Sequence, residues 1–270
     1  MADRYLLEAG APDGYQLEDG SGVLLLDSPV CYRDVILSEP GLVAYWRFGE
    51  ASGNPQDAKG TNHVDTIGGT PTYGVAGALS GDADTAVTLN GTTGYFQAPD
   101  ANPLDIGGGP GSWEFWIKRS ANGAVPVSDK GSAWDIGFTS GNQFKIESYT
   151  TAFVVASESG STTDTNWHYF VITRSTFGVG NTKVYKDGAD VTAVGPSIDD
   201  PDLLVNASPV VLGSNQAHAT FFPGSIDEFA IYNVVLTPSQ VATHYAAVSA
   251  SCPLHASRFV RQAIKRASVY

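Results

Sequence analysis

The stretch 221–245, FFPGSIDEFAIYNVVLTPSQVATHY, combines a turn, a strand and a capped helix in one short run. Pro223-Gly224 marks the turn. From Ile226 to Asn233 the side chains fall into two interleaved sets, as in a β-strand. Thr237 is a suitable N-cap for a short helix, because a proline follows it and Gln240 occupies the third helical position of a capping box. The stretch therefore predicts a strand that leads into a helix.

One residue of this stretch does not fit an apolar face. Strict alternation places Asp227 on the same face as Phe229 and Ile231. A carboxylate that faces a protein core must be paired or bound to a cation. Asp227 is therefore a candidate either for a metal ligand or for a buried ion pair or turn cap.

Most of the rest of the chain consists of short strands separated by turns. The 270 residues include 30 glycines and are 11% aromatic but only 16% charged. Asp187-Gly188 predicts a tight hairpin, and Ser140-Gly141-Asn142 predicts a second turn. Helix is expected only over 238–248 and 255–268. So many strands with so little helix favour an all-β, two-sheet antiparallel sandwich over 41–248.

The charge distribution limits the partners. A net charge of −13 argues against direct nucleic-acid binding, and no apolar run is long enough to span a membrane. Residues 251–270 carry four bases and no acid, so this helical tail either docks on an acidic surface or is solvated.

The first residues do not resemble a secretory signal. Cys31 and Cys252 flank the sandwich, and in a reducing cytoplasm we expect free thiols rather than a disulfide.

Residues 1–40 form a separate arm. YLLEAG (5–10) recurs as YQLEDG (15–20), and GVLLLD (22–27) follows. These short apolar segments predict a small β-meander, which is too small for a core of its own. We expect it to pack on its own domain, on a second copy or on another protein. The predicted organisation is an arm over 1–40, a sandwich over 41–248 and a basic helical tail over 249–270, with a linker at 38–41.

Seven motifs along the sandwich together resemble a known family. They occur in the order LVAYWRFGEASG, AVTLNGTTGYFQAP, SWEFWIKR, NWHYFVITRS, KVYKDGADV, VVLGSN and GSIDEFAIYNVVLTPSQVATHY. This order resembles the laminin-G-like, concanavalin-A-like jelly-roll domains of lectins and glucanases. The resemblance implies two curved antiparallel sheets. It also implies a role in glycan binding, protein binding or structural spacing, and some relatives are glycosidases.

The arm LLEAGAPDGYQLEDGSGVLLLD resembles the N-terminal segments of tailed-bacteriophage structural proteins, particularly minor tail proteins. This resemblance implies a virion protein of the tail or capsid exterior, assembled in the host cytoplasm. Other virion proteins would bind residues 1–40 and the tail 255–268, the sandwich would contact host-surface glycan or a neighbouring subunit, and we expect a homo-oligomer. The alternative is a cellular carbohydrate-binding module, or the lectin-like domain of a glycan-processing enzyme.

The predicted strands lack the carboxylate pair of a glycosidase. Such enzymes need two carboxylates at a fixed separation, and glucanase relatives place them on one strand at alternating positions. Here the three candidate strands carry one each, namely Glu114, Glu147 and Asp135. Glu114 is expected to be a lone polar residue on the concave face. We therefore predict a protein that is not an enzyme.

The resemblance also implies a calcium site, because many relatives hold a structural calcium ion between their first and last strands. Oxygen ligands of the kind that calcium prefers occur at the matching positions, which are Glu50, Asp57, Asn90 and Asp227. The alternative pairs Asp227 with Lys59 or Arg47, or lets it cap a turn. Both readings stay open at the level of sequence.

A glycan site is predicted in the hairpin 133–149. Sugars stack on exposed aromatic rings and are oriented by a few polar groups. The residues near the strand ends that could supply both are Trp134, Asp135, Asn142 and Tyr149. In contrast, Trp46, Trp113 and Trp167 lie within apolar strands and are expected in the core.

Overall fold

The structure is a computed structural model that describes residues 31–106, 109–148, 153–175, 180–193 and 206–250, together with three short strands of the arm. These strands are β1 (Tyr5–Leu6), β2 (Gly14–Leu17) and β3 (Val23–Leu25). They pair in the antiparallel order β1-β2-β3, which confirms the predicted meander. The tail 251–270, including its predicted helix, lies outside the described residues.

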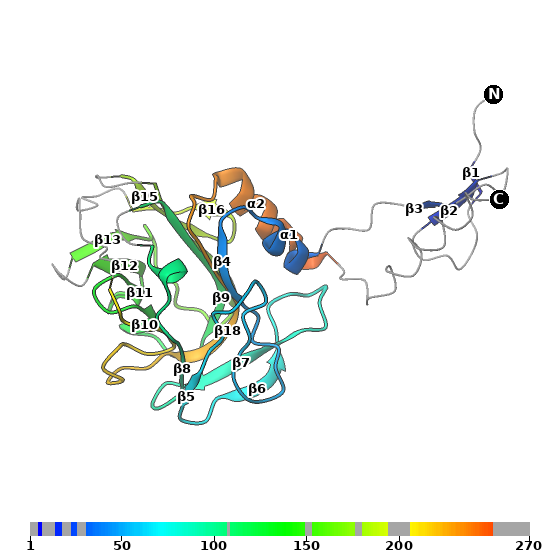
Figure 1. The fold of residues 1–270 in the computed structure, drawn as a ribbon. Helices are drawn as coiled ribbons and strands as arrows, with labels where there is room; N and C mark the ends of the chain where they lie inside the picture. The colour runs from blue at the N-terminus through cyan, green and yellow to red at the C-terminus, as the bar shows by residue number, and fades with distance from the viewer. Residues whose placement is uncertain are drawn as a thin grey trace.

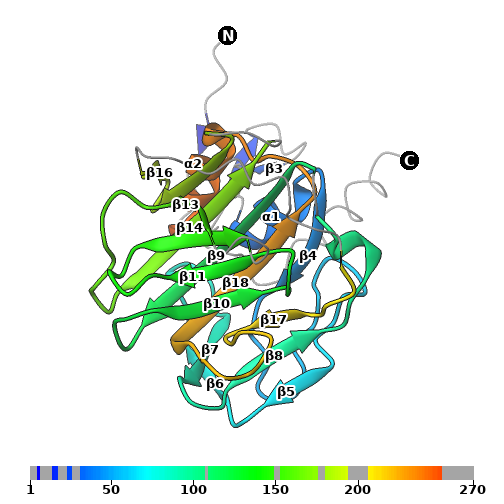
Figure 2. The ribbon, with the colours of Figure 1, turned by 90° about the vertical axis from the view of Figure 1, so that its left-hand side faces the viewer.

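Two antiparallel sheets form a jelly-roll-like sandwich, which confirms the predicted fold class. One sheet has the order β13-β12-β11-β10-β17-β8-β5. The other has the order β16-β15-β14-β9-β18-β7-β6, and β4 also pairs with β18. Figure 2 shows the first sheet in front, with β10 and β11 lying over β9 and β18 of the second.

The strands of the sandwich are short, as the spacing of turn residues predicts. They are β4 (Leu42–Trp46), β5 (Thr66–Gly68), β6 (Thr72–Ala76), β7 (Thr85–Asn90), β8 (Tyr95–Ala98), β9 (Gly111–Arg119), β10 (Val125–Asp129), β11 (Asp135–Phe138), β12 (Phe144–Ser148), β13 (Phe153–Ser157), β14 (Trp167–Arg174), β15 (Thr182–Lys186), β16 (Ala189–Asp190), β17 (Val210–Leu212) and β18 (Pro223–Tyr232). The helical elements are α1 (Tyr32–Ser38), α2 (Pro238–Ala246) and two 3-10 turns, Asn102–Leu104 and Ala247–Ser249.

The main core lies between the two sheets and is rich in aromatic rings. Phe115 and Phe229 stack with ring centroids 4.8 Å apart, and Trp113 meets Trp134 edge-on at 5.2 Å. Trp46 is also fully buried in this core, as predicted. Aromatic pairs of this kind add to the stability that burial alone provides.

A second apolar cluster covers the outer face of the β9–β14–β18 sheet. Helices α1 and α2 lie side by side over this face (Figure 1) and contribute Tyr32, Ile36 and Val241 to the cluster. Trp167 packs against it while half-buried, so this tryptophan belongs to the outer cluster and not to the main core. The helices therefore shield a sheet face that would otherwise be exposed.

Helix α1 was not predicted, since residues 1–40 were assigned to a β arm and helix was expected only near the C-terminus. The seven residues of α1 have no side-chain cap. Only Tyr32 and Ile36, at i and i+4, are buried on its inner face. An isolated helix of this length is unstable in water, so packing on the sheet stabilises α1.

A β-bulge in β18 overturns the predicted face of Asp227. The register shifts between Asp227 and Ala230, and Glu228 adopts a left-handed backbone conformation with φ of 52°. As a result Phe229 and Ile231 point into the main core, while Asp227 and Glu228 contact groups on the outer side of the sheet. Alternation fails here because the extra residue of a bulge resets which face each side chain takes.

Several local predictions are confirmed. Thr237 and Gln240 form the capping box at the start of α2. Asp187-Gly188 makes the turn between β15 and β16 with positive φ at both residues. Cys31 is buried and has no disulfide partner among the described residues. Cys252 lies outside them, so the expectation of free thiols stays a prediction. Over the part of the chain described here, no helix has the length and apolar character needed to cross a membrane.

Candidate functional site

A pocket of about 510 Å³ opens on the outer face of the β10–β11–β12 sheet. Its floor includes Pro126, Asp135, Lys145 and Glu147, which alternate with core residues along their strands. Thr220 belongs to the rim, in the loop between β17 and β18. The pocket therefore brings together side chains from three adjacent strands and one distant loop.

The sheet register places the polar side chains in two rows. Asp129, Asp135 and Glu147 are directly opposite one another across β10, β11 and β12. In the next row Gly137 lies between Pro126 and Lys145. A Cβ at Gly137 would lie 2.4 Å from the carbonyl oxygen of Val125, so glycine permits close pairing of the strands and leaves the floor of the pocket open.

The charges on the floor are unevenly paired. The Lys145 ammonium forms an ion pair with Glu147, whereas its distance to the Asp135 carboxylate is 3.9 Å. Burial raises the pKa of Asp135, and Lys145 opposes this while Glu147 adds to it. Asp135 is therefore the carboxylate on the pocket floor whose charge is least compensated.

Asp129 anchors the rim of the pocket instead of lining it. Its carboxylate accepts hydrogen bonds from the backbone N–H groups of Gln216 and Gly131, at 3.0 and 2.6 Å. Burial raises the pKa of Asp129 to about 6, against the effect of these bonds. The Gln216 amide also donates to the carbonyl oxygens of Asp129 and Pro209, so the loop that carries Thr220 is tied to the end of β10.

The four residues predicted to bind glycan have different environments. Asp135 lines the pocket. Trp134 is fully buried against Trp113 and offers no ring face to a sugar. The Asn142 amide oxygen accepts hydrogen bonds from Arg119 and from Gly123 N–H, so it holds two turns together. Tyr149 lies outside the described residues.

Asp227, the first of the four predicted calcium ligands, is buried on the outer side of β18. Its Oδ2 accepts a hydrogen bond from Ala78 N–H at 2.8 Å, while its buried Oδ1 has no hydrogen-bond partner among the described residues. Burial raises the pKa of Asp227, and the neighbouring Glu228 raises it further. Arg47 forms its ion pairs with Glu228, Asp82 and Asp84. The backbone contact to Ala78 agrees with the turn-capping alternative.

The other three predicted calcium ligands contact separate backbone segments. Asp57 accepts hydrogen bonds from Tyr45, Lys59 and Asn62 N–H groups, and the Asn90 amide oxygen accepts three within its own hairpin turn. Glu50 accepts one from Gln56 N–H. Among the described residues, no group of three or more His, Cys, Asp or Glu side chains could hold a metal ion. Calcium binding stays a prediction from the resemblance.

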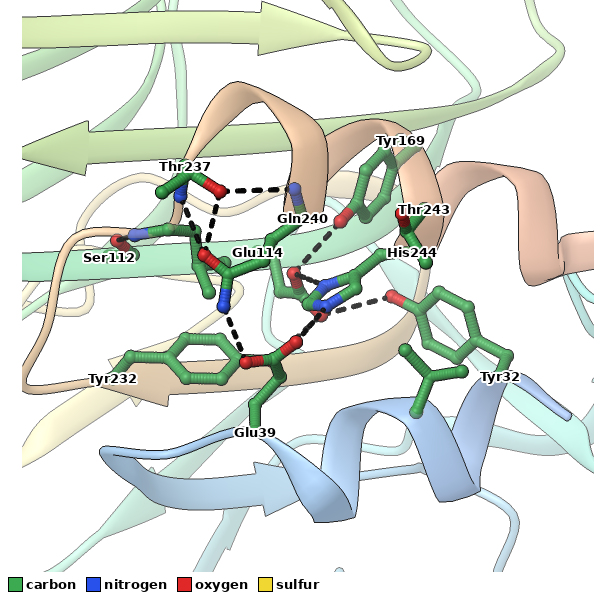
Figure 3. Close-up of polar contacts among 12 residues, drawn as sticks. Tyr32, Glu39, Ser112, Glu114, Tyr169, Tyr232, Thr237, Gln240, Thr243 and His244 are labelled. Carbon is green, nitrogen blue, oxygen red and sulfur yellow. Dashed lines mark hydrogen bonds and ion pairs between the residues drawn. The ribbon is translucent and has the colours of Figure 1, made fainter. Parts of the chain in front are cut away.

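Glu114 is wholly buried on the outer face of β9, beneath α1 and α2. Three tyrosine hydroxyls and one imidazole nitrogen contact its carboxylate; Figure 3 shows Tyr169, His244 and Tyr32 beside it. The Tyr32 and Tyr232 hydroxyls donate to Oε1 at 3.3 and 3.0 Å, and the Tyr169 hydroxyl and His244 Nδ1 contact Oε2 at 2.8 Å. These bonds satisfy a charge that would otherwise be costly to bury.

His244 extends this network to the linker after α1. Its Nε2 lies 3.0 Å from Glu39, and Gln240 also donates to the Glu39 carboxylate. Burial lowers the pKa of His244, but its hydrogen bonds to Glu114 and Glu39 outweigh burial and raise the pKa overall. Because both ring nitrogens face carboxylates, the contacts favour the protonated imidazole. The network is buried between the helices and the sheet, where it stabilises their packing.

Sequence reasoning missed most of the pocket. Lys145 and Glu147 alternate with Phe144 and Ile146, so the period of the strand already puts both charges on one outward face. Nothing local could indicate Thr220, since it reaches the pocket through a loop some 75 residues further along the chain.

Residues 90–242, more than half of the chain, match the family described as the concanavalin A-like lectin/glucanases superfamily. No curated protein sequence matches the chain. Among solved structures, the chain is similar to domain 4 of AbnA, a GH43 extracellular arabinanase from Geobacillus stearothermophilus, in complex with arabinotriose. The TM-score is 0.59 at 22% identity, over 77% of this chain and 100% of that one.

Two other solved structures with a similar fold belong to longer proteins. The Trypanosoma rangeli sialidase in complex with sialic acid matches with a TM-score of 0.58 at 13% identity, over 79% of this chain and 34% of that one. The binding domain of botulinum neurotoxin DC in complex with SialylT matches with a TM-score of 0.53 at 13% identity, over 79% and 52%. At these identities the likeness is one of fold.

Proposed function

The chain belongs to the concanavalin A-like lectin/glucanases superfamily, and we propose that it is a carbohydrate-binding structural protein of a bacteriophage virion, without catalytic activity. The observation that carries the binding role is the pocket on the outer face of β10, β11 and β12. It combines a mixed polar floor with a rim held by a loop, as small-ligand sites commonly do.

The proposal assigns binding and not hydrolysis to this pocket. A glycosidase uses one carboxyl group as an acid and a second carboxylate as base or nucleophile. In the pocket, the Glu147 carboxylate is already engaged in an ion pair with the Lys145 ammonium. Glu114 is enclosed by tyrosines and His244 and cannot reach a substrate.

The virion role rests on the arm. Its three short strands are too few to form a stable unit in water, so a partner surface would stabilise them. We assign that surface to other virion proteins, with the basic residues 255–268 as a second attachment. The sandwich would then be displayed outward toward host-surface glycan.

A binding measurement tests the main proposal. We expect arabinotriose, or another oligosaccharide from a glycan array, to bind the full chain in calorimetry. Replacing Lys145 by alanine should weaken this binding, while a Lys183→Ala control on the opposite sheet should not. Binding to no glycan, with or without a chelator, would remove the carbohydrate role, and release of sugar from a polysaccharide panel would show that the protein is an enzyme.

A separate measurement tests the virion role. Cross-linking of purified particles followed by mass spectrometry should connect residues 1–40 to another virion protein. If the protein is absent from particles, the alternative of a cellular carbohydrate-binding module replaces this part of the proposal.

A further inference from the structure

Asp135 is the feature of the pocket that most demands a ligand. Its side chain is 21% exposed, and its closest charged partner, the Lys145 ammonium, is 3.9 Å away. The described residues donate no hydrogen bond to its carboxylate, although Asp135 lies on the pocket floor. A half-buried carboxylate without donors gains stability when a ligand supplies them.

Lys145 does not satisfy Asp135, because it is committed elsewhere. Its ammonium makes a close ion pair with Glu147, two residues along the same strand. The Lys145 side chain is 10% exposed and Glu147 is 27% exposed. The pair leaves both oxygens of Asp135 available as acceptors at the floor.

The charge around the floor is negative. Asp129, Asp135 and Glu147 form one row across the sheet, and Lys145 is the cation among the described residues that line the pocket. Arg119 lies nearby, but its guanidinium covers the Phe138 ring at 4.0 Å and donates to the carbonyl oxygens of Thr162 and Gly123. A carboxylated ligand would therefore meet repulsion from like charges.

The rim offers groups that suit an uncharged polyol. The Asn215 amide oxygen is occupied by the N–H groups of Ala219 and Thr220. This leaves the Asn215 amide N–H₂ as the donor group of that side chain. The hydroxyls of Thr220 and Ser140 line the same pocket and can both donate and accept.

We propose that the pocket selects uncharged sugars over acidic ones, with Asp135 accepting hydrogen bonds from two neighbouring sugar hydroxyls. This inference rests on the proposed carbohydrate-binding function and specifies its ligand class. Hydroxyl donors to a carboxylate make charge-assisted hydrogen bonds, which are stronger than bonds between neutral groups. The Lys145 ammonium is engaged by Glu147, so a sugar carboxylate would meet mainly the negative charge of the floor.

The test compares matched sugars on the full chain. Galactotriose and trigalacturonic acid differ in their carboxylate groups, and 3′-sialyllactose carries an acidic sugar residue that lactose lacks. We expect the uncharged member of a pair to bind at least about tenfold more tightly at low salt. Salt should reduce this preference, since it screens repulsion between charges.

Two isosteric variants separate the roles of the carboxylates. Asp135→Asn should weaken binding of the uncharged sugar by about tenfold. Glu147→Gln should reduce the difference in affinity between the uncharged and the acidic sugar. Asp65→Asn, which removes an exposed carboxylate near β5, is the control and should change neither. Thermal unfolding of each variant checks that the fold is kept.

The outcomes distinguish this inference from the proposed function. Equal or tighter binding of the acidic sugars would overturn the inference and leave carbohydrate binding intact. Unchanged binding by a folded Asp135→Asn variant would also overturn it. If no sugar of either class binds the chain, the proposed function fails, and the inference fails with it.

Discussion

Replacing Glu114 by glutamine tests the buried network that holds α1 and α2 on the sheet. The change keeps the size of the side chain but removes its charge and one of its two acceptor oxygens. The retained oxygen can still accept from two of the four donors. The new amide N–H₂ then faces the Tyr169 hydroxyl and His244 Nδ1, and His244 loses a carboxylate partner.

The expected loss of stability follows from these contacts. Hydrogen bonds to charged groups contribute about 1.5–3 kcal/mol each, and breaking a buried ion pair on one side costs about 3–5 kcal/mol. We therefore expect Glu114→Gln to lower the free energy of unfolding by about 3 kcal/mol. For a domain of this size that corresponds to a decrease in Tm of about 6–12 °C.

Urea and thermal unfolding followed by tryptophan fluorescence measure this effect, because Trp116 packs in the same outer cluster. The matched comparison is Tyr232→Phe, which removes one hydroxyl donor to the Glu114 carboxylate and should cost about 1.5 kcal/mol, roughly half the loss expected for Glu114→Gln. A Glu114→Gln variant within about 0.5 kcal/mol of the wild type, the usual range for neutral surface changes, would refute the reasoning. It would mean that the network does not stabilise the fold.

Three further predictions concern other sites. Burial raises the pKa of Glu228 from 4.5 to about 7 against the effect of Arg47. Glu228 therefore contributes at most about 3 kcal/mol to the free energy of unfolding. This contribution is fully present below pH 4.5 and is lost as the pH rises through 7. Urea unfolding measured across this pH range should show the loss, and Glu228→Gln should make the free energy of unfolding depend less on pH. Trp134→Ala should cost about 3–5 kcal/mol of stability in the same assay, whereas a surface stacking residue would affect only sugar binding. Gly137→Ala should destabilise by about 1–3 kcal/mol and weaken sugar binding, because the added Cβ would press on Val125; unchanged binding and stability would contradict its place in the pocket floor.

The features predicted correctly depend on neighbours in sequence. The capping box of Thr237 and Gln240 and the turn at Asp187-Gly188 each need only a few adjacent residues. The order of strand motifs was sufficient to predict the sandwich. Asp135, predicted as a glycan-binding residue, lines the pocket, and its role in binding stays a prediction. Local hydrogen bonding and side-chain period decide these features wherever the chain folds.

The features predicted wrongly depend on contacts between distant segments. Trp134 is of a residue type that often stacks on sugars, but it lies in the core, because Trp113 on the other sheet covers it. Asp227 changed faces because of a bulge that only the pairing of β18 with β9 reveals. Helix α1 has too little propensity to be predicted and is stabilised by the sheet beneath it.

The sequence by itself determined that this protein is a sandwich of short antiparallel strands with a capped helix after the last one. Only the tertiary structure decided where the pocket lies, because the register of β10, β11 and β12 and the loop with Thr220 together create it. It also decided that Glu114 is structural, by enclosing it with side chains from Tyr32 to His244. The physical reason is that strand register and helix docking are set by packing of the whole chain, so no local pattern encodes them.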